Sequence, residues 1–141
     1  MSPAATVEEL QALLSHENAF TRPFGFRVES AGDGVCTLDV PFLAEWERPG
    51  GIVSGIVFMT AADVAMWLAI KTRSGLTDTS VTSHMQTSFL RSAKKQGFLC
   101  RATVLKPGRR TSYGVAECVT AEGVLLTHHT LTYVRPDSAV P

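Results

Sequence analysis

Asp63 is the residue whose type and position point most directly to chemistry. It is the one charged residue in the sixteen-residue run Gly55–Ile70, whose other members are almost all apolar. No Lys or Arg lies within a helical turn or two of it, so a local ion pair does not account for the charge. Desolvation without a partner favours the neutral acid, a setting that suits a carboxylate used as a base or nucleophile. The structural alternative is a buried carboxylate bonded to backbone or hydroxyl groups.

Gly55 is the second residue of chemical interest, because it stands at the start of the apolar run. It lies eight residues before Asp63, which corresponds to about 12 Å along an α-helix. Free N–H groups at a helix N-terminus can stabilise an oxyanion, and glycine has no side chain that would block a ligand. One chain cannot bring both groups to the same reacting carbon over that distance. If they cooperate, Gly55 must face Asp63 of a second copy, and a two-fold dimer would contain two equivalent sites.

The segment 80–90 that follows the apolar run has strand character but is unusually polar. With strict alternation, Thr82 and His84 share one face of this strand. Thr82 could then hold the Asp63 carboxylate or a water molecule. His84 could take part in acid–base chemistry, although a lone strand histidine is also a common structural donor. Tyr133, in a later strand, is expected to pack the core or a dimer seam.

The elements that position these residues follow from periodicity and turn signals. Thr6 and Glu9 form a capping box before a helix that ends near residue 17. Ser54 caps the central helix, which is apolar on all sides and needs a cover on most of them. Residues 45–51 are predicted to be a loop. Strands are predicted at 26–30, 35–42, 80–90, 97–106, 111–120 and 124–134. The expected architecture is a single α+β domain, residues 1–141, with a mostly antiparallel sheet curved around a long central helix, an N-terminal helical segment at 1–20 and a tail at 136–141.

Composition excludes several classes of function. The formal net charge is zero, which argues against nucleic acid as a partner. The apolar run is shorter than the ~20 residues that a membrane span needs, so no membrane is expected. The first ten residues lack the pattern of a signal peptide, which favours a cytoplasmic protein. Three cysteines without CxxC spacing are predicted to be buried thiols, and no HxH or HxxxH pattern predicts a metal or another cofactor.

Positive charge is concentrated in one part of the chain. From Thr79 to Ala116 there is no Asp or Glu. Solvated turns account for such a stretch in most proteins, but it could also form a local site for a compact anion. Its basic residues are Arg91, Lys94, Lys95, Arg101, Lys106, Arg109 and Arg110.

The motif RPGGIVSG, then Asp63, then VTSHMQTSFLR resembles the hotdog-fold thioesterases, specifically the phenylacetate-pathway-like acyl-CoA thioesterases. The resemblance covers residues 24–133. The family pattern is roughly N-x-x-G-x-[VL]-H-G-G followed by an acidic residue in the helix. Gly51, Val53, Gly55 and Asp63 match that pattern in register.

The resemblance implies a hotdog fold that hydrolyses an acyl-CoA thioester without a cofactor, as a homodimer or homotetramer. Asp63 would be the nucleophile or general base, the N–H of Gly55 from the partner subunit would polarise the carbonyl, and Thr82 would assist the acid or its water. The residues expected to bind substrate, some of them through the coenzyme A phosphates, are Arg48, Gly51, Val53, Ser54, His84, Arg91, Lys94, Arg109 and Arg110.

The sequence departs from the family pattern at three positions. Arg48, Ser54 and Ile56 stand where the family has Asn, His and a second Gly. Arg48 could replace the amide as a cationic donor, or bind a carboxylate on the acyl group. The departures leave open a non-catalytic acyl-CoA-binding or sensing protein, which binds thioesters without turnover. A dehydratase of this fold generally needs a His at the helix start, and a plain interaction domain would bind no thioester.

Overall fold

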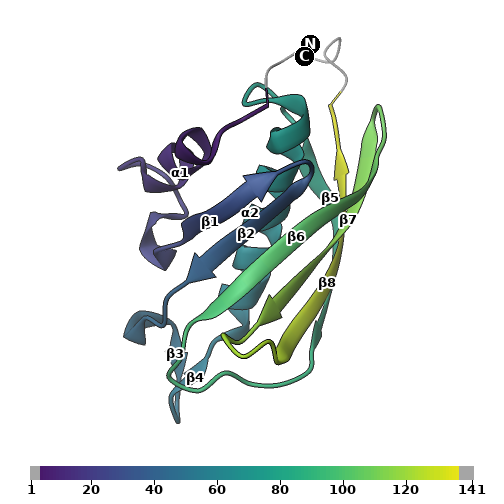
Figure 1. The fold of residues 1–141 in the computed structure, drawn as a ribbon. Helices are drawn as coiled ribbons and strands as arrows, with labels where there is room; N and C mark the ends of the chain where they lie inside the picture. Colours follow the sequence, from purple (N-terminus) through teal and green to yellow (C-terminus); the bar gives the residue numbers. More distant parts are fainter. Residues whose placement is uncertain (1–3, 137–141) are drawn as a thin grey trace.

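The computed structural model describes residues 4–136 and shows an antiparallel sheet curved around one long helix (Figure 1). Six strands form the sheet in the order β1-β2-β6-β7-β8-β5, and β3 pairs with β4 in a separate hairpin. This is the predicted α+β hotdog architecture. In chain order the elements are α1 (Val7–Ser15), the 3₁₀ turn η1 (Arg22–Phe24), β1 (Arg27–Gly32), β2 (Val35–Val40), the 3₁₀ turn η2 (Ala44–Trp46), β3 (Glu47–Arg48), β4 (Ile52–Val53), α2 (Gly55–Ser74), β5 (Val81–Phe89), β6 (Phe98–Pro107), β7 (Thr111–Val119) and β8 (Leu125–Val134).

Helix α2 fills the concave side of the sheet. The Ser54 side chain accepts from the Ile56 N–H at 3.3 Å and starts the helix, and Gly75 ends it. At 20 residues the helix is long and apolar enough to cross a membrane by length and composition, so the exclusion of a membrane span on length is wrong. Because 67% of its most apolar 18-residue stretch is buried inside the protein, α2 is the core helix against which the sheet packs.

The two edges of the sheet differ in how they are covered. At the β1 edge, the side chain of Gln11 on α1 accepts from the Val28 N–H at 2.7 Å. At the other edge, β5 pairs with β8 on one side and has no strand on its other side within residues 4–136. A strand of nine residues with one open edge is a template for pairing with another chain.

A buried carboxylate holds the connection between α2 and β5 in place. The side chain of Asp78 accepts from Ser74 Oγ at 2.7 Å, from the Ser80 N–H at 2.8 Å and from Arg135 Nη2 at 2.8 Å. Burial opposes ionisation, but these hydrogen bonds outweigh it and lower the pKa of Asp78 to about 2. The carboxylate therefore fixes the chain just before Thr82 enters β5.

The sequence predicted the long elements well and the short ones poorly. The capping box at Thr6 and Glu9 is present, and Cys36, Cys100 and Cys118 are free, buried thiols, as expected. The segment predicted as loop 45–51 contains the end of η2, β3 and the turn of the β3–β4 hairpin. Of the predicted tail 136–141, all but Pro136 lies outside the described residues.

We expect Gly114→Ala to destabilise the fold by roughly 1–3 kcal/mol, as overpacking does. A Cβ at Gly114 would lie 2.4 Å from Met66 Cε and 2.4 Å from the Thr103 carbonyl oxygen, so the Met66 side chain and the backbone of β6 would both have to shift. Urea unfolding would measure the change. Gly32→Ala is the matched control, because a Cβ there meets nothing within 4 Å. Equal stability of the two variants would contradict this account of how closely α2 packs on the sheet.

Candidate active site

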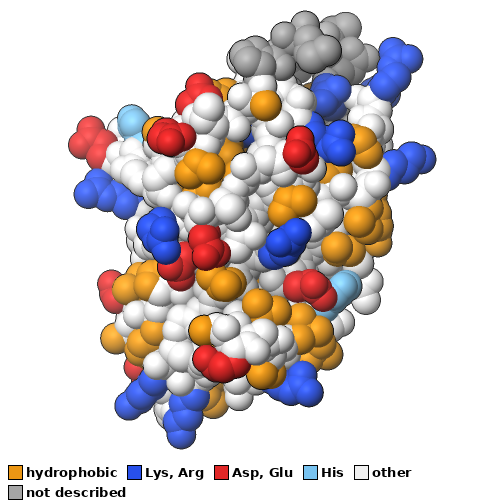
Figure 2. All heavy atoms as spheres, viewed as in Figure 1, with side chains coloured by type: hydrophobic (Ala, Val, Ile, Leu, Met, Phe, Trp, Pro, Cys, Tyr) orange, Lys and Arg blue, Asp and Glu red, His pale blue; other side chains and the backbone are white. Residues whose placement is uncertain are grey.

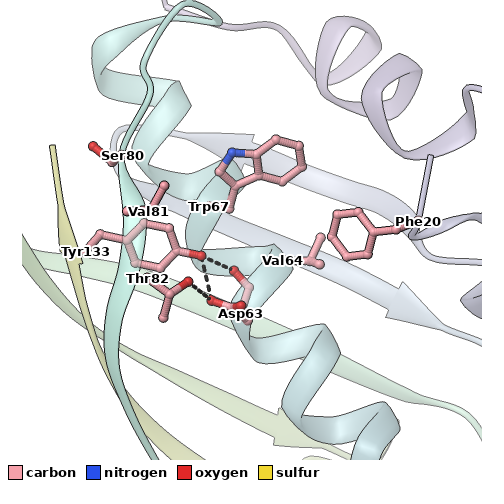
Figure 3. A pocket seen from close by; sticks show the side chains of 8 residues that line it. All are labelled: Phe20, Asp63, Val64, Trp67, Ser80, Val81, Thr82 and Tyr133. Atoms are coloured by element: carbon pink, nitrogen blue, oxygen red, sulfur yellow. Dashed lines mark hydrogen bonds between the residues drawn. The ribbon is translucent and has the colours of Figure 1, made fainter. Parts of the chain in front are cut away.

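The carboxylate of Asp63 is held by two hydroxyl groups from two strands. Tyr133 on β8 donates to Asp63 Oδ1 at 2.6 Å, and Thr82 on β5 donates to the same oxygen at 2.7 Å (Figure 3). The Tyr133 hydroxyl also lies 2.8 Å from the Asp63 backbone carbonyl. Because a phenol has one proton, we assign it to the closer and charged Oδ1. Among residues 4–136, the Asp63 carboxylate therefore has neutral hydroxyl partners and forms no ion pair.

This arrangement makes the two oxygens of Asp63 unequal. Among the described residues, no donor bonds to Oδ2. Two hydrogen bonds to Oδ1 fix the orientation of the side chain. Oδ2 is therefore the oxygen that is available to a water molecule or a substrate.

Tyr133 is suited to remain a donor. Its side chain is 3% exposed, and both burial and the neighbouring Asp63 charge raise the pKa of its phenol. A phenol with a raised pKa keeps its proton at neutral pH and is a poor acid toward a leaving group. Tyr133 is thus a positioning residue for Asp63. The sequence prediction placed it correctly in a buried setting but missed this role.

A bulge in β5 separates Thr82 from His84. The pairing of β5 with β8 shifts register between these two residues. Thr82 points toward α2, as do half-buried Met85, which packs on the core, and Thr87, which bonds to buried His129. His84 therefore lies on the outer face, and the prediction that Thr82 and His84 share a face is wrong. The extra residue of the bulge reverses the alternation.

Asp63 lies at one side of a pocket of about 240 Å³ with mostly apolar walls. Figure 3 shows Trp67 and Val64 on the same helix, Val81 on β5, and Phe20 approaching from the segment after α1. Phe20 is 69% exposed, although it is a large apolar side chain. Phe20 could not be recognised from the sequence, because an isolated Phe in an irregular segment carries no periodic signal.

Gly55 lines a second pocket, of about 440 Å³. Its walls include Arg48, Val53, Phe89 and Arg91. Within residues 4–136 the Gly55 N–H donates to no acceptor, because it belongs to the first turn of α2. A Cβ at Gly55 would lie 3.2 Å from the Phe89 ring, so a larger residue would press on the pocket wall.

The two pockets lie at opposite ends of β5. Val81 and Thr82 at its start line the Asp63 pocket, and Phe89 at its end lines the Gly55 pocket. The strand between these ends is nine residues long, and along α2 Asp63 lies eight residues after Gly55, about 12 Å away. One chain therefore keeps Asp63 and Gly55 in separate pockets, as the spacing in the sequence predicted.

Eight of the nine predicted substrate-binding residues fall into three groups, and His84 lies apart from them. Arg48, Val53 and Arg91 line the Gly55 pocket itself. Gly51, Ser54 and Lys94 lie beside it: Gly51 in the β3–β4 turn, Ser54 as the helix cap, and Lys94 bridged to Ile52. Arg109 and Arg110 lie at the far end of α2, where their carbonyls accept from Arg135. One chain therefore does not bring these two, or His84, to Gly55.

His129 and Cys118 form a buried polar cluster away from both pockets. The His129 ring bonds to Thr87 Oγ1 and Thr127 Oγ1, each at 2.8 Å, and its Nε2 lies 3.8 Å from Cys118 Sγ. His129 and Cys118 are fully buried, whereas half-buried His128 faces the other side of β8. In the part of the chain that the structure describes, no group of three or more acidic, Cys or His side chains could hold a metal ion.

Comparison with known proteins identifies a family. A sequence model of the thioesterase superfamily matches residues 50–127, from the β3–β4 hairpin into β8. A relative from Saccharolobus solfataricus, provisionally named an esterase, is 31% identical over 108 residues, which cover 77% of this chain and 71% of the relative.

Solved structures share the fold. A thioesterase from Haemophilus influenzae is 21% identical and superposes with a TM-score of 0.86, covering 98% of this chain and 95% of its own. A hypothetical thioesterase from Streptococcus pneumoniae, solved with coenzyme A, is 18% identical with a TM-score of 0.72, covering 79% and 86%.

Tyr133→Phe should cost roughly 1.5–3 kcal/mol of unfolding free energy when residue 63 is Asp, the range for a hydrogen bond to a charged group. In an Asp63→Asn background the cost should fall to about 1 kcal/mol, because the acceptor is neutral. A double-mutant cycle in urea at neutral pH measures the difference. Tyr113→Phe, on an exposed side chain, is the control and should change little. An equal cost in both backgrounds would show that Tyr133 does not act on the Asp63 charge.

Proposed function

We propose that this chain, which belongs to the thioesterase superfamily and is a thioester hydrolase, acts on acyl-CoA thioesters with Asp63 as its base or nucleophile. The observation that carries the proposal is the Asp63 carboxylate, which Tyr133 and Thr82 hold through Oδ1 in a mostly apolar pocket, while no donor among the described residues bonds to Oδ2. The coenzyme A bound to the Streptococcus pneumoniae neighbour supports the choice of thioester.

The chemistry follows from the free oxygen of Asp63. Oδ2 either takes a proton from water as that water attacks the thioester carbon, or attacks the carbon itself to give an anhydride that water then cleaves. In both cases negative charge develops on the carbonyl oxygen, the C–S bond breaks, and the thiolate leaves. A backbone N–H aimed at that oxygen stabilises the developing charge, and the free N–H of Gly55 is suited to this task.

The open edge of β5 supplies a way to bring Asp63 and Gly55 together. If two copies pair along β5 in antiparallel fashion, a two-fold axis passes near Met85, the middle of the strand. The start of β5 in one subunit then lies beside the end of β5 in the other. This places the Asp63 pocket of one subunit next to Gly55 of the partner subunit, and each dimer has two such sites.

The proposed cellular setting is the cytoplasm. The three cysteines are free thiols, and Cys100 stands directly opposite Cys118 across β6 and β7 without a disulfide. Free thiols at this spacing fit a reducing compartment, where coenzyme A esters would also be accessible.

Asp63→Asn should lower the rate of thiol release from a panel of short, medium, long and aryl acyl-CoAs by roughly 10²–10⁴-fold, which is the usual contribution of a positioned general base. Asp33→Asn is the matched control, since Asn tolerates the positive φ of 51° at that turn. Normal turnover by Asp63→Asn would mean that another group acts. No release by the wild type, with acyl-CoA still raising the melting temperature, would favour a non-catalytic binding protein.

Gly55→Pro should abolish turnover while keeping α2 intact. Proline is well tolerated at the first helical position and removes the N–H, and Ser54, with ψ of 143°, already has the conformation that precedes proline. Gly55→Ala keeps the N–H and controls for the added carbon.

Pairing Gly55→Pro with Asp63→Asn in one dimer, purified through two different tags, tests whether the site is shared. A shared site predicts about half of wild-type activity, because one site of the mixed dimer has both groups intact. A mixed dimer as inactive as its parents would show that both groups come from the same chain.

A further inference from the structure

The Gly55 pocket contains two arginines in an otherwise mostly apolar setting. Arg48 comes from β3, and Arg91 follows the end of β5. Phe58, Phe89 and Leu90 supply much of the remaining wall. Figure 2 shows basic side chains gathered over the β3–β4 hairpin, at the lower end of the view.

Within the part of the chain that the structure describes, neither arginine forms an ion pair. The ion pairs recorded in residues 4–136 are Arg27–Asp39 and Arg135–Asp78, and no Asp or Glu lines the Gly55 pocket. Arg91 Nη1 donates to the Leu125 carbonyl at 3.1 Å, which orients the guanidinium and leaves its other N–H groups free. Arg48 is held in register with Ile52 by the β3–β4 ladder. Within residues 4–136, therefore, a backbone carbonyl orients the Arg91 guanidinium, Arg48 is fixed through its backbone, and neither guanidinium has an anionic partner.

We infer that Arg48 and Arg91 bind an anionic oxygen group of the substrate, a carboxylate or a phosphate, while the thioester carbonyl lies at Gly55. This rests on the proposed function and extends it to the substrate's charge. A planar guanidinium pairs with such groups through two parallel, charge-assisted hydrogen bonds. Two sources share this chemistry: a carboxylate on the acyl group, or a phosphate of coenzyme A.

Four thioesters distinguish the sources: a neutral acyl-CoA, an acyl-CoA of equal length that ends in a carboxylate, and the N-acetylcysteamine thioesters of both acids. The cysteamine thioesters lack phosphate. Arg48→Gln and Arg91→Gln should each raise KM for the anion-bearing substrate roughly tenfold to a hundredfold, as loss of a charge-assisted hydrogen bond does. The neutral cysteamine thioester should stay within about twofold. Arg101→Gln, an exposed arginine on β6 outside the pocket, is the control.

The pattern of loss identifies the anion. If KM rises for both thioesters that end in a carboxylate, with either carrier, the arginines bind the acyl group. If KM rises for both coenzyme A thioesters, whatever their acyl group, the arginines bind phosphate. Equal losses on the neutral cysteamine thioester, or no loss on any charged substrate, would overturn the inference.

Failure of the proposed function gives a different result, in which the wild type turns over none of the four thioesters. The arginine site is then decided by calorimetry with coenzyme A and with the free dicarboxylic acid. Binding to the wild type that weakens at least tenfold in Arg48→Gln and Arg91→Gln would support the site, and affinity that is absent or unchanged would refute it.

Discussion

The hydrogen bonds from Tyr133 and Thr82 to one oxygen of Asp63 are the interaction on which the site depends. A carboxylate on an apolar core helix is costly unless polar groups replace its water. Here the two donors come from β8 and β5, so the charge also ties α2 to the open edge of the sheet. Because both donors use Oδ1, they offset the cost of desolvating the carboxylate and leave Oδ2 accessible. Under the proposed function, one oxygen of Asp63 would then contribute to stability and the other to the reaction.

The direction of β5 then determines how a site can be completed. The strand begins at the Asp63 pocket and ends at the Gly55 pocket, and its outer edge is unpaired in the described residues. A single chain has the carboxylate in one place and the free helix N–H in another. Antiparallel pairing of two copies would bring unlike ends together. In this account dimerisation is a requirement of the chemistry, since neither pocket alone holds both groups.

Features that depend on residues close together in the sequence could be predicted from it, and features that depend on distant residues could not. Local patterns sufficed for the capping box at Thr6, for α2 and for the long strands, and the spacing of Gly55 and Asp63 correctly predicted that one chain separates them. The bulge after Thr82 was not predictable. Because β5 has polar residues on both faces, its sequence does not show where inward-facing and outward-facing positions exchange. Tyr133 lies 70 residues from Asp63, and only the pairing of β8 with β5 reveals their contact. The β3–β4 hairpin is too short to leave a periodic pattern.

The most direct test of the central claim is a crystal structure of the protein with a ketone analogue of an acyl-CoA, in which CH₂ replaces the sulfur and the carbonyl cannot be cleaved. The account predicts the carbonyl oxygen about 3 Å from the Gly55 nitrogen of one subunit, with the carbonyl carbon facing Oδ2 of Asp63 from the other. A carbonyl bound by both groups of one chain, or bound away from Gly55, would contradict it.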